Sequence, residues 1–367
     1  MAKKTLKIAD KPTLDEVNEN VKMMTQSKGM TLYEFALGTE VYDSPNTSKS
    51  TLPYEFKTGC SVIYNNEIHI MGDYHQVNYK KHYKWNGASW ISVSTLPHAF
   101  ASGSAVVLNN EIHILGGNNT TDTKHYKWDG SSWTEVSTLP YNLYNGSAVV
   151  LDNEIHILGG SVNKTQHYKW DGTSWTEVST LPYDFYNGSA VVYNDEIHIL
   201  GGGSGLGLKN HYKWNGTEWT KVSILPYMVQ SACVVVLNNE IYLIGGDGNA
   251  ESYKIYYKLY KNNWIKLSEL PYNFYNGSAV VHNDEIHILG SNNNSDGGYI
   301  EHYTLPDRFY KPCNEPVLFK DQKIYNKYKL YPLNNCSDNG DYLVVNEDGP
   351  VSFGVETNDE TALITII

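Results

Sequence analysis

The stretch "LPYDFYNGSAVVYNDEIHILGG" occupies residues 181–202 and returns almost unchanged twice elsewhere in the chain. "LPYNLYNGSAVVLDNEIHILGG" begins at Leu139, and "LPYNFYNGSAVVHNDEIHILGS" begins at Leu270. The core of this stretch, "EIHI" or its variant "EIYL", begins at Glu67, Glu111, Glu154, Glu196, Glu240 and Glu285. The spacings are 44, 43, 42, 44 and 45 residues, a period typical of solenoids and propellers.

Each repeat predicts four short antiparallel strands. The first is "GSAVVL", which a two-residue turn ("NN", "DN" or "ND") joins to the second, "EIHILGG". A variable loop precedes the third strand, "HYKW", and an "NG" or "DG" turn precedes the fourth, "SWTEVSTLP". Proline ends the fourth strand because it cannot donate to a ladder. Four such strands make a blade, and blades in a circle leave few exposed edges.

The repeat resembles the kelch repeat. A glycine doublet ends the second strand, at residues 116–117, 159–160, 201–202 and 245–246. Tyrosine and tryptophan then follow seven residues apart, at Tyr83/Trp90, Tyr126/Trp133, Tyr168/Trp175, Tyr212/Trp219 and Tyr257/Trp264. The resemblance covers residues 50–305 approximately and implies an all-β, six-bladed kelch-like β-propeller. The first and sixth repeats depart from it, with "MGD" and "LGS" in place of the doublet.

The sixth repeat is incomplete. After "EHYTLP" at 301–306 there is neither a tryptophan nor a fourth strand. Upstream of the first repeat, "TLYEFALGTEVYDS" at 31–44 reads as an unpaired strand, and "STLP" begins at Ser50. Kelch propellers commonly close by lending a terminal strand to the incomplete blade. We therefore expect a propeller over residues 31–306, with part of 31–52 as the outer strand of the sixth blade.

Composition excludes several classes of protein. The chain has 367 residues, 41% of them hydrophobic and 19% charged, as in globular proteins. The net charge of −12 and the lack of a basic run argue against nucleic acid as a partner. No apolar run is long enough to cross a membrane, and the N-terminus has no signal-peptide apolar region. We expect synthesis and assembly in a bacterial cytoplasm.

Histidine pairs invite a metal interpretation. One histidine lies on the second strand, at His69, His113, His156, His198 and His287. Another precedes the third-strand tyrosine, at His82, His125, His167, His211 and His302. Tyr242 and Tyr256 replace both in the fifth repeat, so the two positions are expected to be neighbours. A pair with no fixed carboxylate is too small a ligand set for a metal, which favours a cross-strand stack or hydrogen bond. We expect no metal and no cofactor.

No catalytic set is visible. There is no nucleophile elbow, zinc motif or phosphate loop, and the glutamate of "EIHI" follows a hairpin turn. Cys60 and Cys233 stand at the serine position of "GSA", where small buried residues are expected. Cys313 and Cys336 could pair in an oxidising compartment, and the sequence leaves this open. The chain is therefore expected not to be an enzyme.

The "YNLYNG", "YDFYNG" and "YNFYNG" connections provide the candidate ligand-binding residues. They place tyrosine beside asparagine at Tyr144/Asn145, Tyr186/Asn187 and Tyr275/Asn276, on the face that also carries the variable loops. A tyrosine ring beside amides suits a sugar, which offers apolar C–H faces and many hydroxyls. In the alternative interpretation, which the recurrence of the motif favours, the rings fill the mouth of the propeller and asparagine fixes the turn.

The two ends lie outside the repeats. Residues 10–26 predict a helix with a capping box at Thr13 and Glu16, within an N-terminal segment 1–30 that anchors or oligomerises the chain. The opening "KIADKPTLDEVNENV" resembles the start of tail fibre and baseplate proteins of phages, or of phage-tail-like particles, from Gram-positive bacteria. Residues 307–367 alternate apolar and polar around an "EDGP" turn and predict a small C-terminal β-module.

Together the two resemblances imply a receptor-binding or tail-fibre protein of a phage or phage-tail-like particle. Its propeller loops would bind a bacterial cell-surface glycan or protein. Its N-terminal helix would bind other tail or baseplate proteins, and a homo-oligomer would add avidity. The alternative is an intracellular kelch scaffold that binds a protein partner, and a third class is a carbohydrate-active enzyme. The ligand, the host and the copy number do not follow from the sequence.

Overall fold

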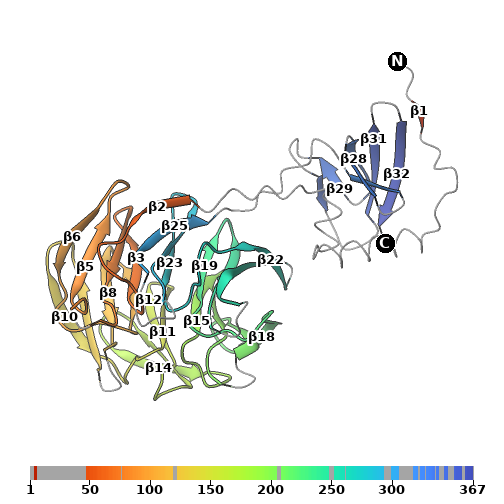
Figure 1. The fold of residues 1–367 in the computed structure, drawn as a ribbon. Helices are drawn as coiled ribbons and strands as arrows, with labels where there is room; N and C mark the ends of the chain where they lie inside the picture. The colour runs from red at the N-terminus through yellow and green to blue at the C-terminus, as the bar shows by residue number, and fades with distance from the viewer. Residues whose placement is uncertain are drawn as a thin grey trace. The chain divides into compact units, whose positions relative to one another are not determined.

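The chain forms two compact units, residues 45–307, and residues 1–44 together with 308–367. The computed structural model describes residues 47–75, 77–118, 122–204, 208–247, 252–260, 262–292 and 299–305, and in the other unit only the strands given below. Unit 45–307 is a six-bladed β-propeller, in which six four-stranded antiparallel sheets surround an axis (Figure 1). This confirms the all-β propeller that the repeat predicts.

The strands of each blade run from the axis to the rim in chain order, except in the sixth. Blade 1 has β3 (Cys60–Tyr64), β4 (Glu67–Met71), β5 (Lys81–Trp85) and β6 (Trp90–Thr95). Blade 2 has β7 (Ser104–Leu108), β8 (Glu111–Leu115), β9 (Lys124–Trp128) and β10 (Trp133–Thr138). Blade 3 has β11 (Ser147–Leu151), β12 (Glu154–Leu158), β13 (Gln166–Trp170) and β14 (Trp175–Thr180). Blade 4 has β15 (Ser189–Tyr193), β16 (Glu196–Leu200), β17 (Asn210–Trp214) and β18 (Trp219–Ile224). Blade 5 has β19 (Cys233–Leu237), β20 (Glu240–Ile244), a 3-10 turn η2 (Ser252–Lys254), β21 (Ile255–Tyr260) and β22 (Asn263–Glu269). Blade 6 has β23 (Ser278–His282), β24 (Glu285–Leu289) and β25 (Glu301–Leu305).

The tight turns of a blade follow directly from its sequence. Between β11 and β12, Asp152 and Asn153 both have positive φ, at 52° and 62°. Asparagine and aspartate tolerate this left-handed conformation, and two such residues in succession match the twist of a hairpin. Between β13 and β14, the Asp171 carboxylate accepts the backbone N–H groups of Thr173 and Ser174 at 2.8 and 2.9 Å. The turns therefore fix the register of the first strand on the second and of the third strand on the fourth.

The fourth strand of blade 6 comes from the other end of the unit. β2 (Thr47–Thr51) pairs antiparallel with β25, so Thr47 lies opposite Thr304 and Thr51 opposite Glu301. The strand therefore lies inside the stretch 31–52 from which a closing strand was expected, and residues 31–46 lie outside the described residues. Lys49 on β2 binds Glu285 at 2.8 Å. In each of the other five blades, a lysine of the third strand forms the corresponding ion pair with the glutamate that begins the second strand. The recurrent glutamate therefore forms an ion pair within every blade.

Neighbouring blades meet through apolar side chains. The first strands β3, β7, β11, β15, β19 and β23 contact one another in order, and β23 contacts β3 to complete the circle. Ile155, Ile157 and Trp170 of blade 3, for example, pack on Leu108 and Val106 of blade 2. One large apolar residue of each connection before a first strand is at most 1% exposed, namely Phe56, Phe100, Leu143, Phe185, Val229 and Phe274. These six buried residues anchor the connections of the loop face to the apolar interior of the propeller.

The other unit contains short strands from both ends of the chain. They are β1 (Lys4–Thr5), β26 (Val317–Lys320), β27 (Lys323–Asn326), β28 (Tyr328–Asn334), β29 (Cys336–Asp338), β30 (Leu343–Val345), β31 (Val351–Thr357) and β32 (Glu360–Ile366). β1, β32, β31 and β28 form one sheet, and β1 pairs parallel to β32. The sequence did not predict that Lys4 and Thr5 join this sheet. The expected helix over 10–26 lies outside the described residues.

Ser50 should be the critical side chain of the closing strand. Its Oγ lies 2.9 Å from His302 Nδ1 and accepts Trp90 Nε1–H at 2.9 Å, so it joins blade 6 to blade 1. Ser50→Ala leaves both groups without this partner and should lower the free energy of unfolding by about 1–3 kcal/mol. Denaturant titration measures the change, with Ser48→Ala, at an exposed position of the same strand, as the control. Equal stabilities of the two variants would contradict this role.

Candidate binding site at the mouth of the propeller

A closed circle of backbone hydrogen bonds surrounds the propeller axis. Each blade contributes one residue whose N–H donates to the carbonyl of the equivalent residue in the preceding blade. The six residues, called here the axial ring, are Thr58, Ser102, Asn145, Asn187, Ser231 and Asn276, and the six N···O distances are 2.6–2.9 Å. The N–H of Thr58 donates to Asn276, which closes the circle between the first and last blades. The ring joins all six blades through main-chain atoms alone.

The conformation of the axial ring explains the "NG" of the repeat. All six ring residues have positive φ, between 53° and 60°. Asparagine visits this left-handed region more readily than most residues, which accounts for Asn145, Asn187 and Asn276. A glycine follows in five blades because there is no room for a side chain, and a Cβ at Gly188 would lie 2.3 Å from the Phe185 ring. The asparagines therefore serve the backbone, and the Asn145 amide also donates to Ser161 Oγ at 3.1 Å.

The residue before each ring residue completes the mouth. These six residues are Lys57, Ala101, Tyr144, Tyr186, Gln230 and Tyr275. The carbonyls of the three tyrosines accept backbone N–H groups from Ser161, Gly203 and Asn292 at 2.8–2.9 Å. Each tyrosine is thus tied to the loop between the second and third strands of its own blade, and its ring is half-buried. In these three blades, the connection before the first strand is therefore hydrogen-bonded to the loop between the second and third strands.

The three predicted tyrosines have different surroundings. Lys164 Nζ lies 5.1 Å from the centroid of the Tyr186 ring, a cation–π contact. The Tyr275 ring lies 4.9 Å from that of Tyr253, centroid to centroid, with 47° between their planes. The contacts of the described residues include none between the rings of Tyr144, Tyr186 and Tyr275. The predicted residues are therefore connected by the main-chain hydrogen bonds of the axial ring, and not by contacts between the three tyrosine rings.

Sequence reasoning missed the residues that surround Tyr275. Tyr253 donates its hydroxyl to Asp247 Oδ1 at 2.8 Å, and this bond raises the pKa of Tyr253 to about 12. Gln230 pairs with Asp247 through both backbone groups and donates its side-chain amide to the Gly203 carbonyl. Tyr253, Asp247 and Tyr275 thus place two aromatic rings and one carboxylate together. Tyr253 and Asp247 lie in a loop without a repeat pattern, so no periodicity could have identified them.

The two departures from the glycine doublet have structural reasons. Asp73 is 0% exposed, and its carboxylate accepts the N–H groups of Lys57 and His75 and the amide of Asn78 at 3.0–3.1 Å. In blade 6, Ser291 is also 0% exposed, and its hydroxyl binds backbone groups of the connection at Tyr275. The backbone N–H groups of Asp73 and Ser291 still donate to the carbonyls of Phe100 and Phe56, as that of Gly160 does to Phe185, so both side chains add contacts to those of the doublet.

The histidine pairs form part of a hydrogen-bond chain between blades. In blade 1, His69 Nδ1 lies 2.8 Å from His82 Nε2, and His82 Nδ1 lies 2.8 Å from Ser94 Oγ. Trp133 of blade 2 donates Nε1–H to Ser94 Oγ at 3.0 Å. The chain recurs as His113–His125–Ser137–Trp175, His156–His167–Ser179–Trp219, His198–His211–Ser223–Trp264 and His287–His302–Ser50–Trp90. This confirms the predicted cross-strand hydrogen bond.

The tryptophan fixes the direction of one of these bonds. An indole N–H can only donate, so Ser94 Oγ accepts from Trp133. The histidine tautomers set the direction of the Ser94–His82 and His82–His69 bonds, and His69 Nε2 is buried with no hydrogen-bond partner among the described residues. Three of the four ring nitrogens of the pair are committed to these bonds. The described residues hold no group of three or more metal-ligating side chains.

The fifth blade shows what the histidine–serine–tryptophan hydrogen bonds require. Tyr242 and Tyr256 replace its two histidines, and both are 0% exposed. The tryptophan that would bind this blade belongs to the outer strand of the next one. In blade 6 that strand is β2, "TSKST", which contains no tryptophan. The histidines and the tryptophan that anchors them are therefore lost together.

The cysteines of the propeller are structural. Cys60 and Cys233 donate Sγ–H to the carbonyls of Gly103 and Gly277 in the following blades. Burial raises the pKa of both thiols to about 12, which keeps them protonated and poor nucleophiles. Cys313 lies outside the described residues.

Comparisons with known proteins support the fold and nothing finer. No protein-family model matches the chain, and no curated protein matches it. The solved structure of YjhT is similar, with a TM-score of 0.62 over 77% of this chain and 100% of that chain. The sequence identity is 15%, so this likeness shows the propeller fold alone. Among the described residues, no helix has the length and apolar character needed to cross a bilayer.

The buried histidines should make the propeller sensitive to acid. Burial lowers the pKa of the second-strand histidines to about 4 and that of the third-strand histidines to about 3. Below about pH 6.5 the unfolded chain therefore binds protons that the folded chain does not, so stability falls as pH falls. Each of these histidines contributes to the loss until the pH reaches its folded pKa, so the free energy of unfolding should fall steadily between pH 6.5 and pH 4.

Urea titrations at about pH 7, 6 and 5 measure this loss, which should begin before most carboxylates take up protons. A free energy of unfolding that is the same at pH 7 and pH 5 would contradict the assignment of neutral histidines.

Proposed function

We propose that the chain is a non-enzymatic receptor-binding or tail-fibre protein of a phage or phage-tail-like particle, and that its propeller mouth binds a glycan of the bacterial surface. The kelch-like repeat and the phage-like N-terminal sequence support the general assignment. The observation that carries the glycan is the mouth itself. There, Tyr144, Tyr186 and Tyr275 stand beside left-handed asparagines on a frame that the axial ring fixes.

The chemistry of the mouth suits a neutral, hydroxyl-rich ligand. The ring residues are threonine, serine and asparagine, which both donate and accept hydrogen bonds and carry no charge. Tyrosine rings can stack on the C–H faces of a sugar while their hydroxyls stay in water. Asp247, near Tyr275, adds a carboxylate that can accept from sugar hydroxyls. Because the frame is rigid, little ordering entropy is lost on binding.

Attachment would follow from the rest of the chain. The N-terminal segment would hold the protein to tail or baseplate partners, and display in several copies would raise the apparent affinity of a weak single site. An intracellular kelch scaffold remains the rival function, and it requires a protein partner and no glycan binding.

Substitution of the three tyrosines by alanine should abolish most of the binding. Blade 2 itself has Ala101 at this position, so the propeller is expected to fold with Tyr144→Ala, Tyr186→Ala and Tyr275→Ala combined. If each ring contributes about 1 kcal/mol, affinity falls about 100-fold. The measurement is binding of the full chain to whole cells and purified cell-wall polysaccharide from a panel of Gram-positive strains.

The control for this experiment is Tyr193→Leu, at the hairpin turn between β15 and β16, because blades 2 and 3 have Leu108 and Leu151 there. Strain-restricted binding that the triple variant loses and the control keeps would support the proposal. Absence of binding to every strain and polysaccharide would overturn it and favour the scaffold.

The asparagine amides can be tested separately from their backbone role. Glycine also adopts positive φ, so Asn145→Gly, Asn187→Gly and Asn276→Gly keep the axial ring and remove only the amides. If the amides bind the ligand, the triple glycine variant should bind polysaccharide about tenfold or more weakly, while the free energy of unfolding falls by only the roughly 1 kcal/mol of the lost hydrogen bond from Asn145 to Ser161. Unchanged binding would assign these residues to the fold alone.

A further inference from the structure

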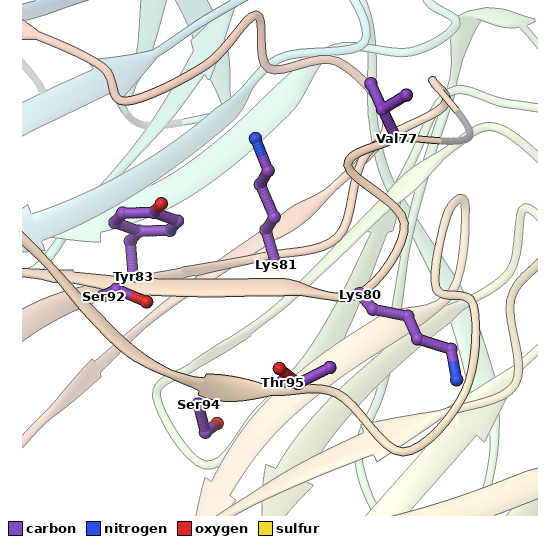
Figure 2. A pocket seen from close by; sticks show the side chains of 7 residues that line it. All are labelled: Val77, Lys80, Lys81, Tyr83, Ser92, Ser94 and Thr95. Carbon is purple, nitrogen blue, oxygen red and sulfur yellow. The ribbon is translucent and has the colours of Figure 1, made fainter.

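Blade 1 has a hollow on its outer half, away from the axial ring. It lies over β5 and β6 and has a volume of about 400 Å³, within the range of small-molecule sites. Its lining residues are Val77, Lys80, Lys81, Tyr83, Ser92, Ser94 and Thr95 (Figure 2). None of these residues belongs to the mouth, so a ligand here would be a second ligand.

The strand register decides which side chains face the hollow. Lys81 and Tyr83 alternate on β5 and point to the same side of the sheet (Figure 2). Their partners on β6 are Thr95 and Ser92. Ser94 points to the opposite side, where it holds His82 and the tryptophan of blade 2. This side of the sheet therefore offers the Lys81 ammonium, one phenol and two aliphatic hydroxyls, and Lys80 also lines the hollow.

The other blades show what is particular to blade 1. In blade 2, Glu135 takes the position of Ser92, where it accepts the Tyr126 hydroxyl at 3.2 Å and binds Lys124 at 3.7 Å. In blade 3, Glu177 accepts the Tyr168 hydroxyl at 3.4 Å. Those blades thus place a carboxylate at the hydroxyl of the tyrosine that recurs in the repeat. Blade 2 also has a lysine at the Lys81 position, Lys124, and blade 6 has a serine at the Ser92 position, Ser48, but blade 1 alone among the six combines the two.

The two lysines of the hollow have no acidic partner. Lys81 Nζ lies 5.0 Å from the centroid of the Tyr54 ring, and Lys80 Nζ donates to the Pro97 carbonyl at 3.2 Å. Within the described part of the chain, no carboxylate forms an ion pair with either lysine. Each ammonium keeps protons for another acceptor. This is a local excess of positive charge in a chain whose net charge is −12.

We propose that this hollow binds a phosphate group carried on a polyol or a sugar. Lysine ammonium groups and hydroxyl donors are common phosphate ligands, and charge-assisted bonds of this kind are stronger than neutral ones. Lys81 contacts the phosphate, while Tyr83, Ser92 and Thr95 donate to its oxygens or to the hydroxyls of the carrier. The hollow has room for the carrier beside the phosphate. The proposal does not depend on the function of the mouth.

The test is titration of the full chain with glycerol 3-phosphate at low ionic strength, followed by calorimetry or ligand-observed NMR. Lys81→Met and Ser92→Glu should each weaken binding about tenfold or more. Ser92→Glu is expected to fold, because Glu135 and Glu177 stand at the same position in blades 2 and 3. Lys124→Met, at the matching site of blade 2, is the control and should bind as the unchanged chain does.

Two further ligands define the chemistry, namely glycerol, which is neutral, and glycerate, which carries a carboxylate. Binding of the phosphate ester alone supports the proposal, whereas equal binding of glycerate would overturn the assignment to phosphate. No binding of glycerol 3-phosphate to the unchanged chain, or equal binding by Ser92→Glu, would overturn the site itself. The alanine variant of Tyr144, Tyr186 and Tyr275 should bind glycerol 3-phosphate normally, so failure of the mouth proposal is distinguishable from failure of this one.

Discussion

The circle of main-chain hydrogen bonds around the axis is the constraint on which the rest of the propeller depends. Six blades of nearly equal sequence can close only if the first donates to the last as every other blade donates to the one before it, and the bond from Thr58 N–H to the Asn276 carbonyl shows that this happens. The geometry requires a left-handed residue in every blade. The need for a left-handed residue in every blade also places short polar residues around the axis. The closure of the circle and the chemistry of the mouth therefore have one cause.

A second set of contacts joins the blades nearer the rim. Each tryptophan of a fourth strand binds the serine of the preceding blade, and that serine orients two buried histidines. Each of these chains joins two neighbouring blades, so a change in one blade has a consequence in the next. The loss of the tryptophan in β2 and the exchange of histidines for Tyr242 and Tyr256 illustrate this coupling. The buried neutral histidines fill space within the blades and form hydrogen bonds with each other and with serine. Because they resist protonation when folded, they lower the stability of the propeller in acid.

Periodicity was sufficient to predict the propeller, the strand order within a blade and the neighbouring histidine positions, because each depends on residues that recur. It also left two interpretations of Asn145, Asn187 and Asn276. A residue needed for its backbone conformation and a residue needed for its side chain recur equally in a repeat, so periodicity does not distinguish them. Asp247 and Tyr253 were missed because their loop has no counterpart elsewhere. The hollow of blade 1 depends on an exchange of glutamate for serine and on strand register, which single letters do not reveal.

The closing strand also determines where the circle can open. Thr47, at the start of β2, lies opposite Thr304, near the end of β25, so the first and last strands of the propeller lie side by side in blade 6. The strands of the other five blades follow one another along the chain, whereas β2 is joined to its blade by the hydrogen bonds and side-chain contacts of the β2–β25 pair. Blade 6 is therefore the seam of the circle, and it can open without passing a stretch of chain from one blade to the next.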